Sequence, residues 1–527
     1  MTLQEKAASL SREEIAELLV SQQERIDQQH QQLEWFKRQL FGSTSERRVF
    51  PVGDARQMGL GEQLATTSVE TAPQITVPSH ARRRRKQPWE GAPDDSGLRY
   101  DPTVPVIEIE VPNADAETHP PDSYTVVDQK VTCRLAQKRG SYVILRYVRK
   151  VIKLKGEDKF SYPPLPTAVL EKSYADVSFL AGLLIDKFRY HLPLYRQHQR
   201  LEASGIKLSR STLTHLVHRT AMLLEPIYEA QLASIQKSSV LAMDETPIKA
   251  GLKRRKQGKG KMKSAYFWPM YGDRDEIAFF FSPSRGQDAA RKALGTFSGV
   301  LVTDGYKVYE RFAEVTDDVQ RAQCWSHARR KFVQSEPVEP ELSNKALDFI
   351  GALYEHETTI RERGLTGGAK LEFRAMHCKP IVDAFSAWLH DAFQKRILLP
   401  SNLFTKAASY ALERETSLRV FLENPDVPID TNHLEREIRS IAVGRKNWLF
   451  CWTEVGARYA GLVQSLLTTC RLHGIDPYVY FVDVLQRIAI HPANQVEQLT
   501  PRCWKELFAT DPLPSDLDLG IAKHVSA

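Results

Sequence analysis

The chain has 527 residues, which at about 150 residues per domain predicts three or four folding units rather than one simple core. Its composition, 42% hydrophobic and 26% charged, is that of a globular protein, and its apolar runs fall well short of the roughly 20 residues that a membrane-spanning helix needs. The formal net charge of +7 permits nucleic-acid binding without requiring it, so the position of the basic residues matters more than their sum.

The start of the chain and the cysteine pattern indicate a reducing compartment. The N-terminal sequence MTLQEKAASLSREEIAELL has acidic residues early and lacks the basic and then apolar pattern of a secretory signal. The six cysteines lie far apart and form no CxxC pair, so neither a disulfide framework nor a usual zinc-ligand spacing is visible. We therefore expect a cytoplasmic protein without a membrane segment.

Residues 10–41 predict a long polar helix that begins with a capping box at Ser11 and Glu14. Within this helix, apolar residues recur every seven positions, and the companion core positions are half glutamine. The heptad residues are Leu19, Ile26, Leu33 and Leu40. We expect residues 1–42 to form a weak or register-specific coiled coil that mediates self-association. The alternative is a solitary amphipathic helix packed on its own domain.

Two modules of different character follow the first helix. Residues 43–104 carry Gly, Pro, Ser and Thr without sustained periodicity, which predicts a flexible basic linker. Its run RRRRK, residues 82–86, could neutralise DNA phosphates, although many such runs are only solvated. Residues 105–165 alternate apolar and polar side chains in VPVIEIEV and SYVILRYVRKVIK, so we expect a small β-rich module.

Residues 166–238 are expected to be helical and to include a helix-turn-helix arrangement. The segment YRQHQRLEASGIKLSRSTLTHLV has a helical pattern, a turn at Gly205, and a second helix that Ser209 or Ser211 can cap. The first turn of the second helix would offer Arg210 to a DNA groove. Many helical hairpins with a glycine turn bind nothing, so a purely structural role is the alternative.

From residue 239 the pattern indicates strands with acidic residues at their ends. SVLAMDETPIK is a short apolar strand interrupted by Asp244, and SAYFWPMYGD and EIAFFFSPS continue as the second and third strands of a meander. A helix over 287–297 precedes a fourth apolar strand, SGVLVTDGYKVYERF, which ends in Asp304. RAQCWSHARRKF is expected to be the strand that follows. A lone strand-end aspartate is usually a turn former or a helix cap.

This order of elements is that of an RNase H-like sheet, in which the first and fourth strands are neighbours. That adjacency would bring Asp244 and Asp304 to one sheet edge, where two carboxylates can bridge hard divalent cations. The later helix TNHLEREIRSIAVGRKNWLF adds Glu435, which shares a helix face with Arg436 and Arg439. Such a carboxylate is more often part of a surface ion pair, but beside two strand-end aspartates it is a candidate third ligand.

Four blocks, LAMDETP, LVTDGYKVY, CWSHARRKF and NHLEREIRSIAVGRKNWLF, closely resemble the insertion-sequence-66 family of DDE transposases. The resemblance extends from LFGSTSER through HLPLYRQHQRL and LSRSTL to RLHGIDPYVYFVDVL. It implies that Asp244, Asp304 and Glu435 are the catalytic, metal-binding triad, served by two Mg²⁺ or Mn²⁺ ions. It also implies that the substrates are the terminal inverted repeats of a transposon and target DNA. Accessory proteins encoded by the same element are further implied partners.

These interpretations together predict an α+β multidomain chain. The RNase H-like mixed sheet would comprise residues 239–332 and 426–486, interrupted by an all-α insertion at 333–425 and followed by a C-terminal tail at 487–527. The coiled-coil helix and the β-rich module would precede it. The resemblance also implies a zinc module before the catalytic domain. The equivalent stretch holds only Cys133, so no zinc is expected here.

Basic and aromatic residues near the expected carboxylates are candidate DNA contacts. His327 could contact the scissile phosphate, or it could be a structural histidine bonded to backbone. Trp325 and Trp448 could stack on an unpaired base, although core packing is the simpler interpretation. The remaining phosphate-binding candidates are Arg436, Arg439, Arg445 and Lys446 on the Glu435 helix, and Lys253, Arg254 and Arg255 in the basic loop KRRKQGKGKMK.

The function we expect is metal-dependent strand cleavage and strand transfer at the ends of an insertion sequence. Two other functions fit parts of the pattern. The chain could be a DNA-binding regulator that has lost catalysis, or a different RNase H-like nuclease that uses the same carboxylates on RNA–DNA hybrids or branched DNA. Such a nuclease would have little use for a coiled coil, a helix-turn-helix and a basic linker.

Overall fold

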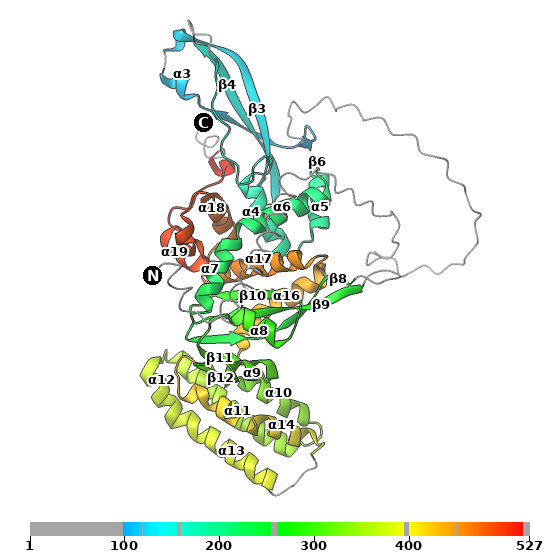
Figure 1. Ribbon diagram of the computed structural model, residues 1–527, viewed down its shortest axis with the longest axis vertical. Helices are drawn as coiled ribbons and strands as arrows, with labels where there is room; N and C mark the ends of the chain where they lie inside the picture. Colours follow the sequence, from blue (N-terminus) through cyan, green and yellow to red (C-terminus); the bar gives the residue numbers. More distant parts are fainter. Residues whose placement is uncertain are drawn as a thin grey trace, which may run out of the picture. The chain divides into compact units, whose positions relative to one another are not determined.

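The computed structural model describes residues 98–118, 120–138, 140–154, 160–253, 261–394, 400–448 and 451–519 (Figure 1). Their contacts assign them to one unit, residues 87–527. The expected coiled-coil helix and nearly all of the expected basic linker lie outside the described residues. Of the helices that the structure describes, none is both long and apolar enough to cross a membrane.

The β-rich module is a sheet in which β4 is the central strand. β2 runs parallel to β4 on one side and β3 runs antiparallel to it on the other, while the short β5 also pairs with β4. A small apolar core that includes Leu145 and Tyr147 lies against Leu517 from the far end of the described chain. The strands are β2 (Val106–Val111), β3 (Tyr124–Lys138), β4 (Ser141–Leu154) and β5 (Phe160–Ser161). The expectation of strands in this stretch is confirmed.

The helical region has the predicted order, with one addition in its turn. The helices are α4 (Val177–Phe188), α5 (Leu194–Ala203), α6 (Arg210–Leu223) and α7 (Glu225–Ile235). Ser209 caps α6, as predicted, because its side chain accepts a hydrogen bond from the Thr212 backbone N–H at 3.1 Å. Between α5 and α6 the chain forms a short strand, β6 (Ile206–Lys207), which pairs with β1 (Arg99–Tyr100). The turn is therefore anchored to a segment about 100 residues earlier in the chain.

The central sheet has the strand order β10-β9-β7-β11-β12, and β8 extends the pairing of β9. β7, β11 and β12 are parallel, whereas β9 and β10 are antiparallel to their neighbours. The predicted adjacency of the first and fourth strands, β7 and β11, is confirmed. The strands are β7 (Val240–Met243), β8 (Thr246–Lys253), β9 (Lys261–Tyr271), β10 (Ile277–Ser282), β11 (Gly299–Thr303) and β12 (Val319–Gln323).

Two details of the predicted strands are wrong. The first predicted strand is two strands, β7 and β8, which break at Asp244 and Glu245 because these acidic residues do not continue the buried strand. The last predicted strand ends at Gln323, and WSHARRKF belongs to helix α10 (Trp325–Ser335). The buried apolar residues of α10 recur at helical spacing, whereas a strand would bury every second residue. These residues are Trp325, Ala328 and Phe332.

The helix α17 (Glu454–Leu472) packs against the central sheet, and two further helices follow the strands β10 and β11. The helix α17 packs on β10, where the Phe279 N–H donates to Ser465 Oγ at 2.8 Å. A Cβ at Gly461 would lie 2.4 Å from the Phe279 carbonyl oxygen, so only glycine permits this close contact. α8 (Gln287–Leu294) follows β10, and α9 (Lys307–Glu314) follows β11.

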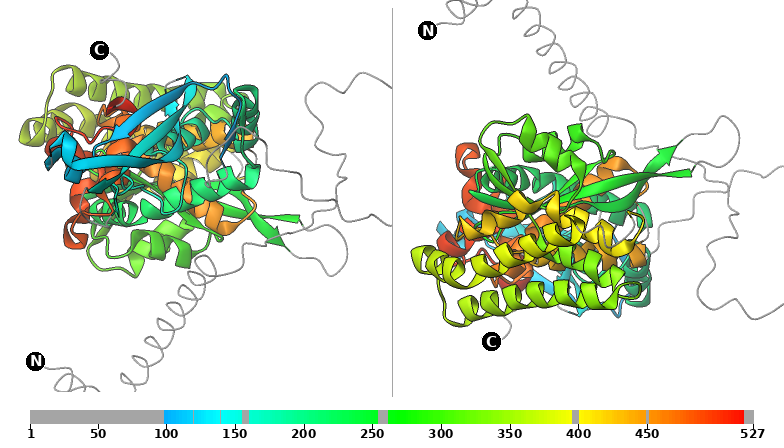
Figure 2. Two further views of the ribbon diagram at one scale, coloured as in Figure 1. Left: turned by 90° about the horizontal axis from the view of Figure 1, so that it is seen from above. Right: turned by 90° about the horizontal axis from the view of Figure 1, so that it is seen from below.

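The described residues of the stretch expected to be an all-α insertion form helices joined by turns, with no strand among them. Its helices are α11 (Pro340–Glu362), α12 (Gly367–Phe373), α13 (Lys379–Gln394), α14 (Leu403–Leu412) and α15 (Glu415–Arg419). Figure 2 shows them lying side by side, with α11 against α10 and α13. Arg374 is fully buried and bonds to Glu357 and to the carbonyls of Phe421, Asn424 and Val427. It thereby secures the segment that returns to α16 (Asn432–Trp448).

The C-terminal stretch packs on the rest of the unit. α18 (Pro477–Arg487) contacts α4, and α19 (Pro501–Leu507) contacts α17. Trp504 on α19 is buried and donates its indole N–H to Asp483 at 2.9 Å. The described part of the expected C-terminal tail therefore contributes to the core.

Candidate functional site

The register of β7 on β11 determines where the two strand-end aspartates lie. Val240 pairs with Val300 and Ala242 pairs with Val302 in a parallel ladder. The offset of this ladder, 300 − 240 = 60 residues, equals the separation of Asp244 and Asp304, 304 − 244 = 60. Both aspartates therefore leave the sheet at the same edge and at the same height, on neighbouring strands about 4.8 Å apart.

Asp244 lies in an environment that disfavours its charge. Burial raises its pKa from the usual 3.8 to about 7, and the negative charges of Glu245, Asp304 and Glu435 act in the same direction. A hydrogen bond from the Glu245 backbone N–H, 2.7 Å from Asp244 Oδ1, opposes the shift. Asp304 is held by its own turn, since its Oδ1 accepts from the Tyr306 N–H at 2.8 Å. Asp304 and Glu435 are both close enough to Asp244 for their charges to raise its pKa.

Cys324 ties the Asp304 strand to the helix that carries Glu435. The Cys324 N–H donates to the carbonyl of Thr303, the residue before Asp304, at 3.1 Å. The Thr431 N–H lies 3.4 Å from Cys324 Sγ, and the Thr431 carbonyl accepts from the Glu435 N–H at 2.9 Å. This chain of contacts brings the first turn of α16 to the edge of the sheet.

Two cationic or ionisable groups of α10 contact Glu435. His327 Nε2 lies 3.6 Å from Glu435 Oε1, and Arg330 Nη2 lies 3.5 Å from Oε2. Burial lowers the pKa of His327, although Asp304 and Glu435 oppose this effect, so the imidazole is neutral at pH 7. Its buried Nδ1 has no hydrogen-bond partner among the described residues. The backbone bond considered for a structural histidine is thus not seen in the described chain.

Glu245, which the sequence interpretation did not use, is engaged on both oxygens. Its side chain is 3% exposed and forms an ion pair with Arg285, whose Nε is 2.8 Å from Oε1. The hydroxyl of Tyr309 donates to Oε2 at 2.7 Å. Arg285 also lies over the ring of Tyr306, 4.2 Å from its centroid, two residues beyond Asp304. This cluster therefore connects the two loops that carry Asp244 and Asp304.

The other predicted contacts are distributed over the surface. Arg436, Arg439 and Lys446 are exposed on α16, and Arg445 donates to the carbonyl of Pro247 just beyond Asp244. Arg210 is exposed at the start of α6, with its guanidinium carbon 5.6 Å from the Tyr195 ring centroid. Lys253 ends β8, but its side chain and the whole of Arg254 and Arg255 lie outside what the structure describes.

The two tryptophans considered for base stacking differ in what the structure describes. Trp325 is a core residue, 1% exposed, and its indole N–H donates to the Leu418 carbonyl at 2.9 Å. Trp448 is the last residue of α16, and its side chain lies outside the described part. Core packing of Trp325, the simpler of the two interpretations, is confirmed.

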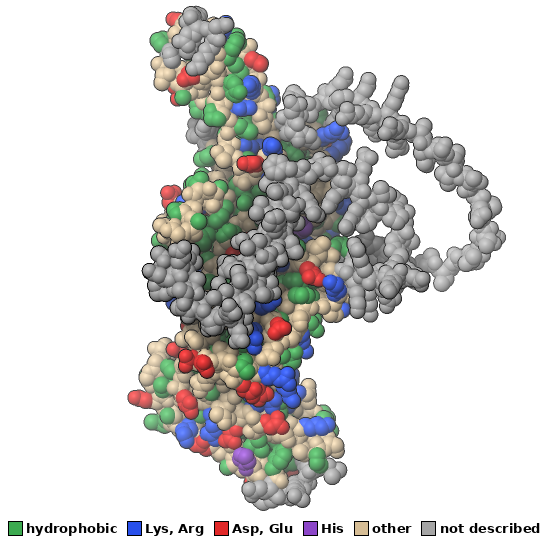
Figure 3. Space-filling model, viewed as in Figure 1, with side chains coloured by type: hydrophobic (Ala, Val, Ile, Leu, Met, Phe, Trp, Pro, Cys, Tyr) green, Lys and Arg blue, Asp and Glu red, His purple; other side chains and the backbone are tan. Residues whose placement is uncertain are grey.

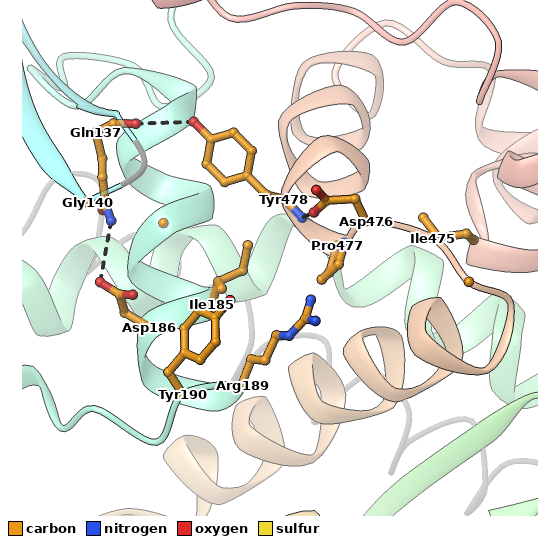
Figure 4. A pocket seen from close by; sticks show the side chains of 12 residues that line it. Gln137, Gly140, Ile185, Asp186, Arg189, Tyr190, Ile475, Asp476, Pro477 and Tyr478 are labelled. Carbon is orange, nitrogen blue, oxygen red and sulfur yellow. Dashed lines mark hydrogen bonds between the residues drawn. The ribbon is translucent and has the colours of Figure 1, made fainter.

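A cavity of about 570 Å³ lies between the β3–β4 turn, α4 and the start of α18 (Figure 4). Gln137 crosses it, accepting on its carbonyl from the Tyr478 hydroxyl at 3.2 Å and donating its side-chain N–H to Asp186 at 3.4 Å. Asp244, Asp304 and Glu435 do not line this cavity. It is therefore separate from the carboxylate site.

The chemistry of the carboxylate site fits hard divalent cations. The described residues contain no group of three His, Cys, Asp or Glu side chains already arranged as metal ligands. The donor set is nevertheless made of carboxylate oxygens, which Mg²⁺ and Mn²⁺ prefer. Glu435 Oε1 is buried without a hydrogen-bond partner among the described residues, and burial together with neighbouring acids raises the pKa of Asp244. A cation would relieve both features.

Relatives from Sinorhizobium fredii match over long stretches but are themselves uncharacterized. The uncharacterized protein y4jD is 32% identical over 358 residues, which cover 65% of this chain and 68% of the relative. The uncharacterized protein y4hP is 28% identical over 510 residues, 90% of this chain and 88% of the relative. Among solved structures, the Drosophila P element transposase strand transfer complex matches with a TM-score of 0.32 at 12% identity, over 55% of this chain and 91% of that chain. That score is too low to establish a shared fold.

Family models match most of the chain. Residues 28–95 match a model described as Transposase C of IS166 homeodomain, and residues 465–502 match the IS66 C-terminal element. Residues 172–459, more than half of the chain and all three candidate carboxylates, match the model of the Transposase IS66 family. The chain belongs to the IS66 family of transposases.

Proposed function

We propose that this chain is a DDE transposase that uses Asp244, Asp304 and Glu435 to cleave and join DNA at the ends of an insertion sequence. One observation carries the proposal: the parallel β7–β11 register brings two strand-end aspartates to one edge, where the charge of Glu435 also acts on Asp244. Burial and the charges of its acidic neighbours raise the pKa of Asp244, which has no structural benefit of its own but suits the binding of divalent cations.

The strand order supports an RNase H-like catalytic core. A meander of three antiparallel strands (β7, β9, β10), followed by two strands parallel to the first (β11, β12), has the order and directions expected for that fold. Residues 239–332 and 426–486 would form this core, and residues 333–425 its all-α insertion. The match to the family is independent support, since it rests on sequence and not on topology.

The reaction proposed is phosphoryl transfer in two steps that share one site. Water first forms a bond to the phosphorus at each transposon end, and the bond to the 3′ oxygen breaks, leaving a 3′-OH and a 5′-phosphate. That 3′-OH then attacks a target phosphodiester and displaces another 3′ oxygen. Bound divalent cations would activate the attacking oxygen and stabilise the leaving oxygen.

The residues of this chain would have distinct tasks in these steps. Asp244 and Asp304 would hold the cations from the sheet edge, and Glu435 would complete the ligand set from α16. Burial lowers the pKa of His327, and its Nδ1 has no hydrogen-bond partner among the described residues, so the imidazole would be free to donate to a phosphate or to accept from the nucleophile. Arg436, Arg439, Arg445 and Lys446 remain proposed phosphate contacts, as do Arg210, Lys253, Arg254 and Arg255.

The proposed partners are transposon-end DNA, target DNA and a second copy of the chain through residues 1–42. Accessory proteins from the same element are a further proposed partner. The proposed location is a bacterial cytoplasm. It is supported by the six cysteines, which all belong to the described residues and are all free.

Strand cleavage tests the proposed function. The full chain would be incubated with supercoiled plasmid and with terminal-repeat DNA in Mg²⁺ or Mn²⁺, and compared with Asp244→Asn and Glu435→Gln. We expect 3′-OH nicks at the repeat ends that both variants abolish, while Asp317→Asn, an exposed turn residue, cleaves as wild type. Binding of the ends without cleavage, even with neighbouring element proteins added, would contradict the proposal and favour a regulator. Preference for RNA–DNA hybrids would instead favour another nuclease.

A further inference from the structure

Helix α10 presents a face that carries two cations, Arg330 and Lys331, beside the imidazole of His327, and the packing of the opposite face sets its direction. One face of α10 is buried and includes Trp325, Ala328 and Phe332. His327, Arg330 and Lys331 stand at i, i+3 and i+4 and so share one face of the helix. The packing of the apolar residues therefore determines the direction in which these three side chains project.

This face borders the carboxylate site at two points. Arg330 Nη2 is 3.5 Å from Glu435 Oε2, while the Arg330 side chain is 54% exposed. Lys331 Nζ lies 5.6 Å from the ring centroid of Tyr410. A Cβ at Gly305, next to Asp304, would lie 2.7 Å from the same ring. Lys331 is thus placed over a ring that abuts the Asp304 turn.

The positive charge on this face exceeds what its neighbours neutralise. Lys331 is exposed and forms no ion pair with any described residue. Arg330 has a single described carboxylate partner, Glu435, whose oxygens a divalent cation would need. A cation on Glu435 would neutralise that partner and repel Arg330, which would then be available to another anion. Figure 3 shows Lys and Arg side chains gathered over the region that Figure 1 labels α9 and α10.

We propose that Arg330 and Lys331 form a phosphate-binding face, which holds the DNA backbone beside the Asp304–Glu435 edge. The inference rests on the proposed function, because it takes DNA to be the anion. An exposed guanidinium fork and an exposed ammonium group can donate to phosphodiester oxygens, and contacts to phosphates carry no sequence information. Binding through this face is therefore independent of DNA sequence. Neither residue was among the contacts predicted from sequence.

The salt dependence of DNA binding tests this face. The full chain would bind labelled duplexes, one with the terminal repeat and one unrelated, in Ca²⁺ over a range of salt concentrations. Each lost phosphate contact lowers the slope of log K against log salt by about 1. We expect a decrease of about 2 for Arg330→Ala combined with Lys331→Ala, equal on both duplexes. The charge-preserving pair Arg330→Lys with Lys331→Arg should retain most of the slope.

A matched control separates this face from general charge. Arg291 and Lys292 are also consecutive, exposed cations on a helix, α8, so replacing both with alanine removes the same charge. An unchanged slope in the α10 pair, or an equal decrease in the α8 pair, would overturn the proposal. Lys331→Gln alone, at an exposed helix position, covers the case in which the double variant fails to fold, and its slope should decrease by about 1.

The experiment and the cleavage test can fail independently. Binding is read without cleavage, and Asp244 and Glu435 are left intact. A decrease in slope with no cleavage by wild type would support the phosphate-binding face and contradict the catalytic proposal. If cleavage depends on Asp244 and Glu435 but the Arg330→Ala, Lys331→Ala variant keeps the wild-type salt slope, the catalytic proposal is supported and the phosphate-binding face is contradicted.

Discussion

Asp244 should make the stability of the protein depend on pH. Its pKa is about 7 in the folded chain and 3.8 when exposed, so the folded state holds the proton more tightly. This stabilisation is complete below pH 3.8 and is lost as the pH rises through 7. Asp244→Asn should therefore unfold at a higher temperature than wild type at pH 8 in EDTA, and the difference should shrink toward pH 4. Thermal unfolding followed by circular dichroism over this pH range measures it.

The same variant separates stability from function. The cleavage rate of Asp244→Asn should fall by more than about 100-fold. Loss of a residue that only supports a metal ligand lowers activity by about 10- to 100-fold. Asp317→Asn, on an exposed turn, is the control and should change neither quantity. A melting temperature of Asp244→Asn that stays below that of wild type at pH 8 would show that the Asp244 charge is already compensated in the folded chain.

The Arg285–Glu245 pair should stabilise the turn that carries Asp244. Arg285→Ala leaves the buried Glu245 carboxylate with the Tyr309 hydroxyl as its one remaining side-chain partner among the described residues. Because Arg285 itself is 46% exposed, we expect a loss of about 1–3 kcal/mol. We expect denaturant unfolding to show this loss. The double variant with Glu245→Gln should recover part of it, because no buried charge remains. Arg274→Ala, in an exposed turn, is the control, and an equal loss there would argue against the pair.

At the residue scale the sequence singled out the candidate acidic residues more readily than their cationic neighbours. Asp244 and Asp304 stood out because a carboxylate at the end of an apolar strand breaks the pattern, and Glu435 stood out on a helix with arginines. Arg330 was missed because WSHARRKF was taken as a strand, which hides the i, i+3 relation to His327. Glu245 and Arg285 are 40 residues apart, so only the tertiary fold reveals their pairing.

The contact between Gly305 and Tyr410 joins two elements that are distant in sequence. Tyr410 belongs to α14 of the helical insertion, and its hydroxyl accepts from Gln323 Nε2 at 3.0 Å. Gly305→Ala would place a Cβ 2.7 Å from the ring, so either Tyr410 or the Asp304 turn must move. We expect a loss of about 1–3 kcal/mol from overpacking and, where the turn moves by about 1 Å, about 100-fold slower cleavage.

A double-variant cycle identifies the cause of that loss. Tyr410→Ala removes the clashing ring, so the combination with Gly305→Ala should cost less than the sum of the two single changes. Gly351→Ala, where a Cβ meets nothing within 4 Å, is the matched control and should be tolerated. Strict additivity in both stability and cleavage would show that α14 does not support the Asp304 turn.

The fold was predictable where periodicity was strong and local. The apolar runs VLAM and GVLVT predicted strands β7 and β11, and the order of the elements predicted that they are neighbours. The position of β8 was not predictable, because its pairing depends on β9 and on a bridge from Ala250 to Cys451, some 200 residues away. The strand β6 was hidden in the same way, since its partner β1 lies in another part of the chain.

At the scale of the whole molecule, the three candidate carboxylates come from three separate segments. Asp244 follows β7, Asp304 follows β11 and Glu435 lies on α16, and long stretches of chain lie between them. A cation bound by all three would link these segments in the folded state only. It would therefore stabilise the fold by mass action, by about 2.7 kcal/mol at a concentration 100 times the dissociation constant.

Addition of Mg²⁺ without DNA should accordingly raise the melting temperature of the full chain at pH 8. Asp244→Asn and Glu435→Gln should each lose most of this rise, whereas Asp317→Asn should keep it. At pH 6 the rise in melting temperature should be smaller in wild type. Asp244, with a pKa of about 7, is then mostly protonated, and the proton competes with the cation for its carboxylate. A rise that is equal in wild type and in both variants would mean that the ion binds elsewhere. The convergence of these segments would then need a different explanation from the proposed metal chemistry.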